Sequence, residues 1–153
     1  MELRLVYGDL LDQDVEVIVN AWNRNLFPWW LLIPQGVSKA IRRRAGTAPF
    51  RELRSKGVLA LGAAVETGAG RLPLRAIIHV AGIGLLWRSS ERAVRASVRN
   101  AIALAKNRGY RSIAFPLIGA GTGGKRREDV RTWMQSELAA LEYPGQVRIV
   151  ELA

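Results

Sequence analysis

The residues with the most specific chemical meaning lie in one glycine-rich stretch. Ile113 to Phe115 is a short apolar run, and it leads into Gly119-Ala120-Gly121-Thr122-Gly123-Gly124 before a charged helical pattern begins at Lys125. Glycines leave no side chain between the backbone and a ligand, and successive amides in such a turn form a concave site for an anion. The stretch predicts a phosphate-binding loop between a strand and a helix, with a tight structural turn as the alternative.

Polar residues follow two other strand patterns. Asp9 comes after the alternating residues 2–7, and its carboxylate can accept a hydrogen bond from an exocyclic amine such as that of adenine, or can cap a turn. Asn20 and Asn23 come after the apolar run 15–19, and their amides can bind sugar hydroxyls or satisfy a turn.

A helix start supplies a further candidate anion site. Gln35-Gly36-Val37-Ser38 opens a helical pattern, and the free N–H groups and positive dipole of a helix N-terminus favour an anion. Ser38 can orient a water or contact the ligand, or it can serve only the first helical turn. Among candidate general bases, His79 lies in an apolar strand and is typical of a core histidine, while Glu66 and Glu91 are typical of a solvated surface.

Hydrophobic periodicity predicts the elements that position these residues. Strand patterns occur at 2–7, 15–19, 63–67, 76–81, 113–115 and 146–152, and helical patterns at 36–45, 49–56, 90–108 and 127–141. This alternation predicts a three-layer α/β/α sandwich with a mixed, mostly parallel six-stranded sheet, and we expect one domain over residues 1–153. In such sheets ligands bind at the carboxyl ends of the strands, so the loops after Tyr7, Val19 and Phe115 are expected to converge.

Composition excludes several classes of function. The chain has no cysteine, which excludes thiol catalysis and disulfides, and its single histidine makes a zinc site improbable. No metal or other cofactor is expected. The N-terminus does not have the pattern of a signal peptide and no apolar run of about 18 residues occurs, so we expect a cytoplasmic protein.

The positive charge is the most unusual global property of the sequence. The formal net charge is +10, and it comes mainly from arginine. Such a surface attracts polyanions, either nucleic acid or a phosphate-bearing ligand. Three clusters contribute: Lys39 with 42–44, Arg92 with Arg95 and Arg99, and 125–127. Solvated helix faces and a nucleic-acid contact both remain open for each cluster.

Together these pieces resemble the macrodomain family, whose fold binds ADP-ribose. The resemblance covers nearly the whole chain and rests on motifs in the family's order: Gly8-Asp9-Leu10, residues 17–23, Gly36-Val37 with the helix to Gly46, residues 78–82, and residues 115–124. It implies recognition of ADP-ribose, free or as a terminal modification of a macromolecule. It also implies a possible activity, the hydrolysis of ADP-ribosyl or O-acyl-ADP-ribose esters.

The resemblance assigns roles by position. Asp9 matches the acid that contacts the adenine amine, with the Leu10 backbone beside it, and Asn23 matches the residue that holds the distal ribose. Gln35-Gly36-Val37 matches the end of the first phosphate loop, and Gly119 to Gly124 matches the second, which cradles the diphosphate.

The departures from the family pattern concern catalysis. Ser38 stands where many ADP-ribosyl hydrolases have an Asp that helps to activate water. Gly123 stands where many members have an aromatic residue and one branch has a catalytic Asp. Trp22 replaces the second alanine of an Asn-Ala-Ala-Asn motif, and Pro34-Gln35 replaces two glycines. With both carboxylates absent, three hypotheses remain: an unusual hydrolase, a non-catalytic ADP-ribose-binding module, and a basic nucleic-acid-binding protein.

An apolar insert lies between two of the candidate motifs. Trp29-Trp30-Leu31-Leu32-Ile33 separates Asn23 from Gly36. It can pack over the edge of the core, close over the distal ribose as a lid, or form a dimer contact.

Overall fold

The computed structural model describes residues 1–23, 36–57, 59–83, 89–120 and 125–152. Six strands form one sheet: β1 (Glu2–Tyr7), β2 (Val17–Asn23), β3 (Ala64–Thr67), β4 (Ala76–Ile83), β5 (Ser112–Phe115) and β6 (Gln146–Glu151). Their order is β1-β6-β5-β2-β4-β3, and every neighbouring pair is parallel except β3 with β4. The prediction of a mixed, mostly parallel six-stranded sheet is confirmed.

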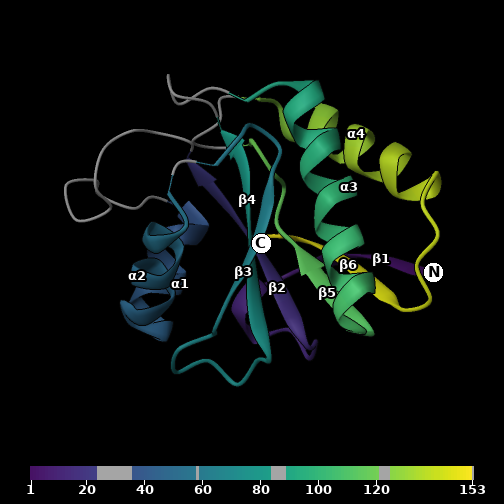
Figure 1. Ribbon diagram of the computed structural model, residues 1–153. Coiled ribbons are helices and arrows are strands. Elements are labelled where there is room, and N and C mark those ends of the chain that lie inside the picture. The colour runs from purple at the N-terminus through teal and green to yellow at the C-terminus, as the bar shows by residue number, and fades with distance from the viewer. Residues whose placement is uncertain (24–35, 58, 84–88, 121–124, 153) are drawn as a thin grey trace.

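Helices cover both faces of this sheet. A short 3-10 helix, η1 (Leu10–Asp12), follows β1, and α1 (Gly36–Ala45) and α2 (Ala48–Ser55) lie on one face of the sheet. On the opposite face lie α3 (Glu91–Arg108) and α4 (Arg127–Ala139) (Figure 1). The structure is therefore the three-layer arrangement that the alternation of patterns predicts. Within the described residues, no helix is both long and apolar enough to cross a membrane.

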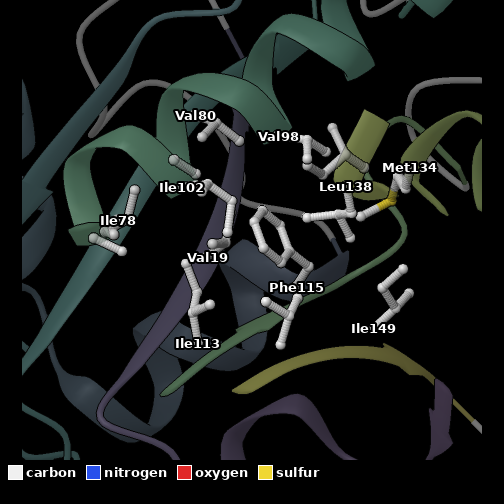
Figure 2. Packing of buried hydrophobic residues seen from close by; sticks show 14 of the residues in the cluster. Val19, Ile78, Val80, Val98, Ile102, Ile113, Phe115, Met134, Leu138 and Ile149 are labelled. Atoms are coloured by element: carbon white, nitrogen blue, oxygen red, sulfur yellow. The ribbon is translucent and has the colours of Figure 1, made fainter. Parts of the chain in front are cut away.

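Successive side chains of β2 point to opposite faces of the sheet, so they contribute to two separate hydrophobic clusters. Val17 and Val19 pack in the cluster beneath α3 and α4, whereas Ile18 packs in the cluster beneath α1 and α2. All three side chains are completely buried, as expected for a central strand covered on both sides. Figure 2 shows the first cluster, in which the Phe115 ring lies among aliphatic side chains from the sheet and from both helices.

The boundaries of β2 differ from the prediction. The strand was expected over 15–19 and to stop at Asn20, but it begins at Val17 and continues to Asn23. Asn20 and Ala21 continue the ladder opposite His79 and Val80, and the register shifts only before Asn23. A polar side chain does not end a buried strand when its hydrogen bonds are satisfied inside the protein. The other elements agree with their patterns to within a few residues.

Candidate functional site

The predicted site residues follow the carboxyl ends of parallel strands. Since β1, β6, β5, β2 and β4 all run in one direction, these ends share one edge of the sheet (Figure 1). Gly8 to Leu10 follow β1, and Ile118 to Ala120 follow β5. Of the other predicted ligand residues, Gln35 and Gly121 to Gly124 lie outside the described residues, and Asn23 and Gly36 are described in their backbone alone.

Asp9 caps a 3-10 helix with one carboxylate oxygen, and its other oxygen remains accessible. Its Oδ1 accepts a hydrogen bond of 2.9 Å from the Leu11 N–H, which caps η1, while the Leu10 side chain is buried. Its Oδ2 lies 3.9 Å from Arg44 Nη1, and 49% of the side chain is exposed. The turn-capping alternative is thus correct for one oxygen, and the second oxygen remains accessible to a donor such as an exocyclic amine.

A chain of buried polar groups crosses the sheet beside the start of α1. The Ser38 hydroxyl donates to Asn20 Oδ1 at 2.8 Å, and Asn20 Nδ2 lies 3.0 Å from His79 Nδ1. On the other side of the imidazole, His79 Nε2 lies 2.8 Å from Thr67 Oγ1, which donates to the Gly68 carbonyl at 2.9 Å. The chain therefore joins α1 to three neighbouring strands, β2, β4 and β3.

The direction of every hydrogen bond in this chain follows from its two ends. Asn20 presents its amide hydrogens to His79, so Nδ1 of the imidazole must accept. A neutral histidine then carries its proton on Nε2 and donates to Thr67, whose own proton goes to Gly68. Burial, with a smaller contribution from the charge of Lys56, lowers the pKa of His79 to about 3, in agreement with a neutral ring.

This geometry gives Asn20 a supporting role and confirms the interpretation of His79 as a core histidine. Asn20 is fully buried, and its amide oxygen and nitrogen lie within hydrogen-bond distance of Ser38 and His79, so it supports Ser38. Its assignment as a ligand-binding residue stays a prediction. His79 is likewise fully buried, as expected of a core histidine. Ser38 is 6% exposed and has given its only proton to Asn20, so toward a ligand or water its hydroxyl can only accept.

The two acidic candidates for a general base lie in other places. Glu66 is on β3, where it accepts a hydrogen bond from the Tyr110 hydroxyl and pairs with Arg108. Glu91 is in the first turn of α3 and pairs with Arg95 at 2.9 Å. Both carboxylates are engaged in surface ion pairs, as the surface interpretation predicts.

The start of the glycine-rich loop is held by tight contacts that the sequence pattern did not reveal. Gly119 has φ of +85°, and a Cβ there would lie 2.5 Å from Ser89 Oγ. Ser89 in turn donates to the carbonyl of Gly82, at the end of β4, while the neighbouring Ser90 caps α3. The sequence shows two adjacent serines before a helix, which indicates a helix cap. Only the structure shows that Ser90 is the cap and that Ser89 bonds to β4.

The described residues on either side of the loop are joined to each other. The Lys125 N–H donates to the Gly119 carbonyl at 3.1 Å, and Ala120 and Lys125 form an isolated parallel bridge. Residues 121–124 therefore connect two positions whose separation is fixed. The predicted diphosphate loop has its entry and exit at the same edge as Asp9.

Comparison with known proteins shows that this chain is similar to macro domain proteins in both sequence and structure. The Macro domain family model matches residues 19–134. A macro domain-containing protein of Streptomyces griseus is 42% identical over 97% of this chain and 86% of its own, and an O-acetyl-ADP-ribose deacetylase of Escherichia fergusonii is 38% identical over 80% and 70%. The solved structure of an Oceanobacillus iheyensis macrodomain with ADP superposes with a TM-score of 0.85, at 28% identity over 99% of this chain and 83% of its own.

The His79→Gln variant should lose a pH dependence that the native protein has. Below about pH 6.5 the unfolded histidine takes up a proton, whereas the native ring stays neutral down to about pH 3. Stability contributed by neutral His79 is complete above pH 6.5 and is lost as pH falls, by about 1.4 kcal/mol per pH unit. Urea unfolding from pH 7 to pH 4 should show that the difference in unfolding free energy between the native protein and the variant decreases at that slope. If both unfolding free energies changed in parallel with pH, the assignment of a buried, neutral His79 would be contradicted.

The Ser38→Asp variant should reverse the hydrogen-bond chain. A carboxylate cannot donate to Asn20 Oδ1, so the amide must turn over, and His79 must then carry its proton on Nδ1. His79 is the only histidine, so nitrogen NMR of the imidazole reports this tautomer directly. The matched Ser38→Ala variant should keep the Nε2–H form and lose about 1–3 kcal/mol of stability, because Asn20 Oδ1 is left unpaired. An unchanged tautomer in the folded Ser38→Asp protein would refute the proposed polarity.

Gly119→Ala and Gly109→Ala form a matched pair. Both glycines have positive φ, +85° and +77°, so alanine costs about 1–2 kcal/mol at each position. At Gly109 no atom lies within 4 Å of the added Cβ, whereas at Gly119 it collides with Ser89. Urea unfolding should find Gly119→Ala less stable than Gly109→Ala by a further 1–3 kcal/mol, approximately. Equal losses would show that Ser89 can move aside freely.

Proposed function

The chain belongs to the Macro domain family, and we propose that it binds ADP-ribose, free or as the terminal group of a modified macromolecule. The observation that carries the proposal is the meeting of three features at one edge of the sheet: the accessible oxygen of Asp9, the N-terminus of α1 and the joined ends of the glycine-rich loop. The solved Oceanobacillus iheyensis macrodomain with ADP, at 28% identity, and relatives named O-acetyl-ADP-ribose deacetylase support it.

Each of these features fits one part of ADP-ribose. In the proposed complex Asp9 Oδ2 accepts from the adenine amine, with the Leu10 backbone beside the base. The first turn of α1, which includes Gly36 and Val37, contains no acidic residue, so its N–H groups and dipole can face a phosphate. Gly119 and Ala120 lead into the loop proposed for the diphosphate, and Asn23 is proposed for the distal ribose.

We further propose that the bound ligand takes part in its own hydrolysis. Ser38 has no proton to give and is too weak a base to deprotonate water, and Glu66 and Glu91 are engaged in ion pairs on β3 and α3. A water positioned by a ligand phosphate or ribose hydroxyl needs no enzyme carboxylate. With an O-acetyl ester as the substrate, the oxygen of this water would attack the acyl carbon. The bond from that carbon to the ribose oxygen would then break, and acetate and ADP-ribose would leave.

A non-catalytic binding module is the second candidate function. It is favoured by Ser38, because the hydroxyl is committed to the buried chain and the position carries no carboxylate. The third hypothesis, a nucleic acid in place of ADP-ribose, is less consistent with this edge, where the single accessible oxygen of Asp9 would face a polyanion. The edge fits one small ligand with an amine at one end and phosphates in the middle.

Calorimetry with ADP-ribose tests binding, and Asp9→Asn tests the adenine contact. Asparagine caps a helix as well as aspartate does, so η1 should remain intact, but an amide that caps through its oxygen turns a donor toward the adenine amine. Loss of a hydrogen bond to a charged group is worth about 1.5–3 kcal/mol, so affinity should fall at least about tenfold. Asp12→Asn is the matched control: Asp12 also pairs with Arg44, and its removal should leave affinity nearly unchanged.

A product assay on the same samples separates hydrolase from binding module. Incubation with O-acetyl-ADP-ribose or an ADP-ribosylated peptide should release free ADP-ribose above a buffer control. Release that survives in Ser38→Ala would support catalysis by the ligand, while heat of binding without release would identify a binding module. No heat at high ADP-ribose concentration would refute the central proposal.

A further inference from the structure

The positive residues on the two faces of the sheet differ in their partners. On the α3–α4 side, Arg95, Arg99, Arg126 and Arg131 pair with Glu91, Glu137, Glu128 and Glu151 at distances from 2.6 to 3.3 Å. On the α1–α2 side, Arg44 pairs with Asp9 and Asp12, whereas Arg43, Arg51 and Arg54 have no ion pair among the described residues. Most arginines of the α3–α4 side are therefore neutralised by a nearby carboxylate, whereas these three on the α1–α2 side are not.

The unneutralised residues form one surface, here called the α1–α2 patch. Residues 36–57 contain seven basic residues and a single acid, Glu52, which accepts a hydrogen bond from the Gly68 N–H. Six exposed side chains have no ion pair among the residues that the structure describes, namely Lys39, Arg43, Arg51, Arg54, Lys56 and Arg71. Arg71 belongs to the patch because a Cβ added to Gly46, at the turn between the two helices, would lie 3.7 Å from the Arg71 guanidinium.

The patch faces solvent because the apolar sides of both helices face the sheet. Ile41, Phe50 and Leu53 are at most 2% exposed, and α1 and α2 cover one face of the sheet, on the left in Figure 1. None of the described residues of α1 or α2 is an exposed large hydrophobic side chain. A surface that enters a lipid interface presents apolar residues beside its charges, so the α1–α2 patch fits a soluble polyanion better.

From this asymmetry we infer that the α1–α2 patch binds the phosphate backbone of duplex DNA. Guanidinium groups without protein partners are suited to bidentate contacts with phosphate oxygens, and a row of them matches a row of phosphates. The single aromatic residue of α1 and α2, Phe50, is buried, so the patch has no ring on which the bases of a single strand could stack.

The side chains of the patch also favour DNA over RNA. Recognition of duplex RNA relies on contacts with 2′-hydroxyls as well as phosphates. The arginines and lysines of the patch can only donate, and the groups beside them that could accept a 2′-hydroxyl proton are few, namely Glu52, Ser55 and Thr47. Binding is therefore expected to be independent of base sequence, and it goes beyond the proposed function because it uses a face distinct from the edge assigned to ADP-ribose.

Fluorescence anisotropy with a short labelled DNA duplex tests the inference. The triple variant Arg43→Gln, Arg51→Gln, Arg54→Gln removes three charges from the α1–α2 patch. Its matched control, Arg95→Gln, Arg99→Gln, Arg108→Gln, removes three ion-paired arginines from α3. The native protein should bind more weakly as salt rises from about 50 to 200 mM, and the patch variant should lose at least about tenfold in affinity with a shallower salt dependence. The control should stay within about twofold.

Several outcomes would overturn the inference. Equal losses in the two triple variants would mean that net charge alone attracts DNA, and absence of salt-dependent binding by the native protein would exclude the surface altogether. Tighter binding of a duplex RNA, a single strand or phosphatidylserine vesicles would replace DNA as the occupant. The DNA titrations are run without ADP-ribose, and in a separate titration excess ADP-ribose should not compete with DNA, so this test can fail while the proposed function holds. Circular dichroism confirms that each variant is folded.

Discussion

The arrangement of the site depends on the rule that buried polar groups must be hydrogen-bonded. Asn20, His79 and Thr67 lie on three adjacent strands in the interior, and each would be costly alone. They satisfy one another in series, and the series ends at Ser38 in the first turns of α1. The helix whose N-terminus is proposed for a phosphate is thus fixed to the sheet by a bond with one direction. A packing contact would allow the helix to slide, whereas a chain of donors and acceptors does not.

The opposite side of the site is fixed by steric contact instead of polar bonding. Gly82 and Gly119 bring the ends of β4 and β5 so close to their neighbours that a Cβ at either position would meet Ile118 or Ser89 within 2.5 Å. Ser89 fills this space and bonds to the Gly82 carbonyl. One of the two proposed phosphate positions is therefore held by hydrogen bonds and the other by close packing, and both lie at the same edge of the sheet.

The sequence predicted the fold well because periodicity reports burial, and burial is what both faces of the sheet require. It placed nearly every element and the edge at which the loops meet. It could not show the buried partners of Asn20, since a polar residue after an apolar run has the same pattern whether it meets solvent or a buried partner. The partners, His79 and Ser38, lie 59 and 18 residues away, and no local pattern shows that they touch. For the same reason the sequence could not distinguish the basic clusters from one another. Ion pairs with distant glutamates distinguish the two faces of the sheet, and the spacing of the arginines does not.

The replacement of a carboxylate by Ser38 has a consequence beyond the loss of a base. A carboxylate at that position could not donate to Asn20, so the tautomer of His79 and the orientation of Thr67 would have to be opposite to those observed. The identity of one residue at the site therefore sets the proton arrangement across three strands. In this chain the arrangement leaves Ser38 as an acceptor, which suits a water or hydroxyl held in place and does not suit its deprotonation. Under the proposed function, the base for hydrolysis would come from the substrate.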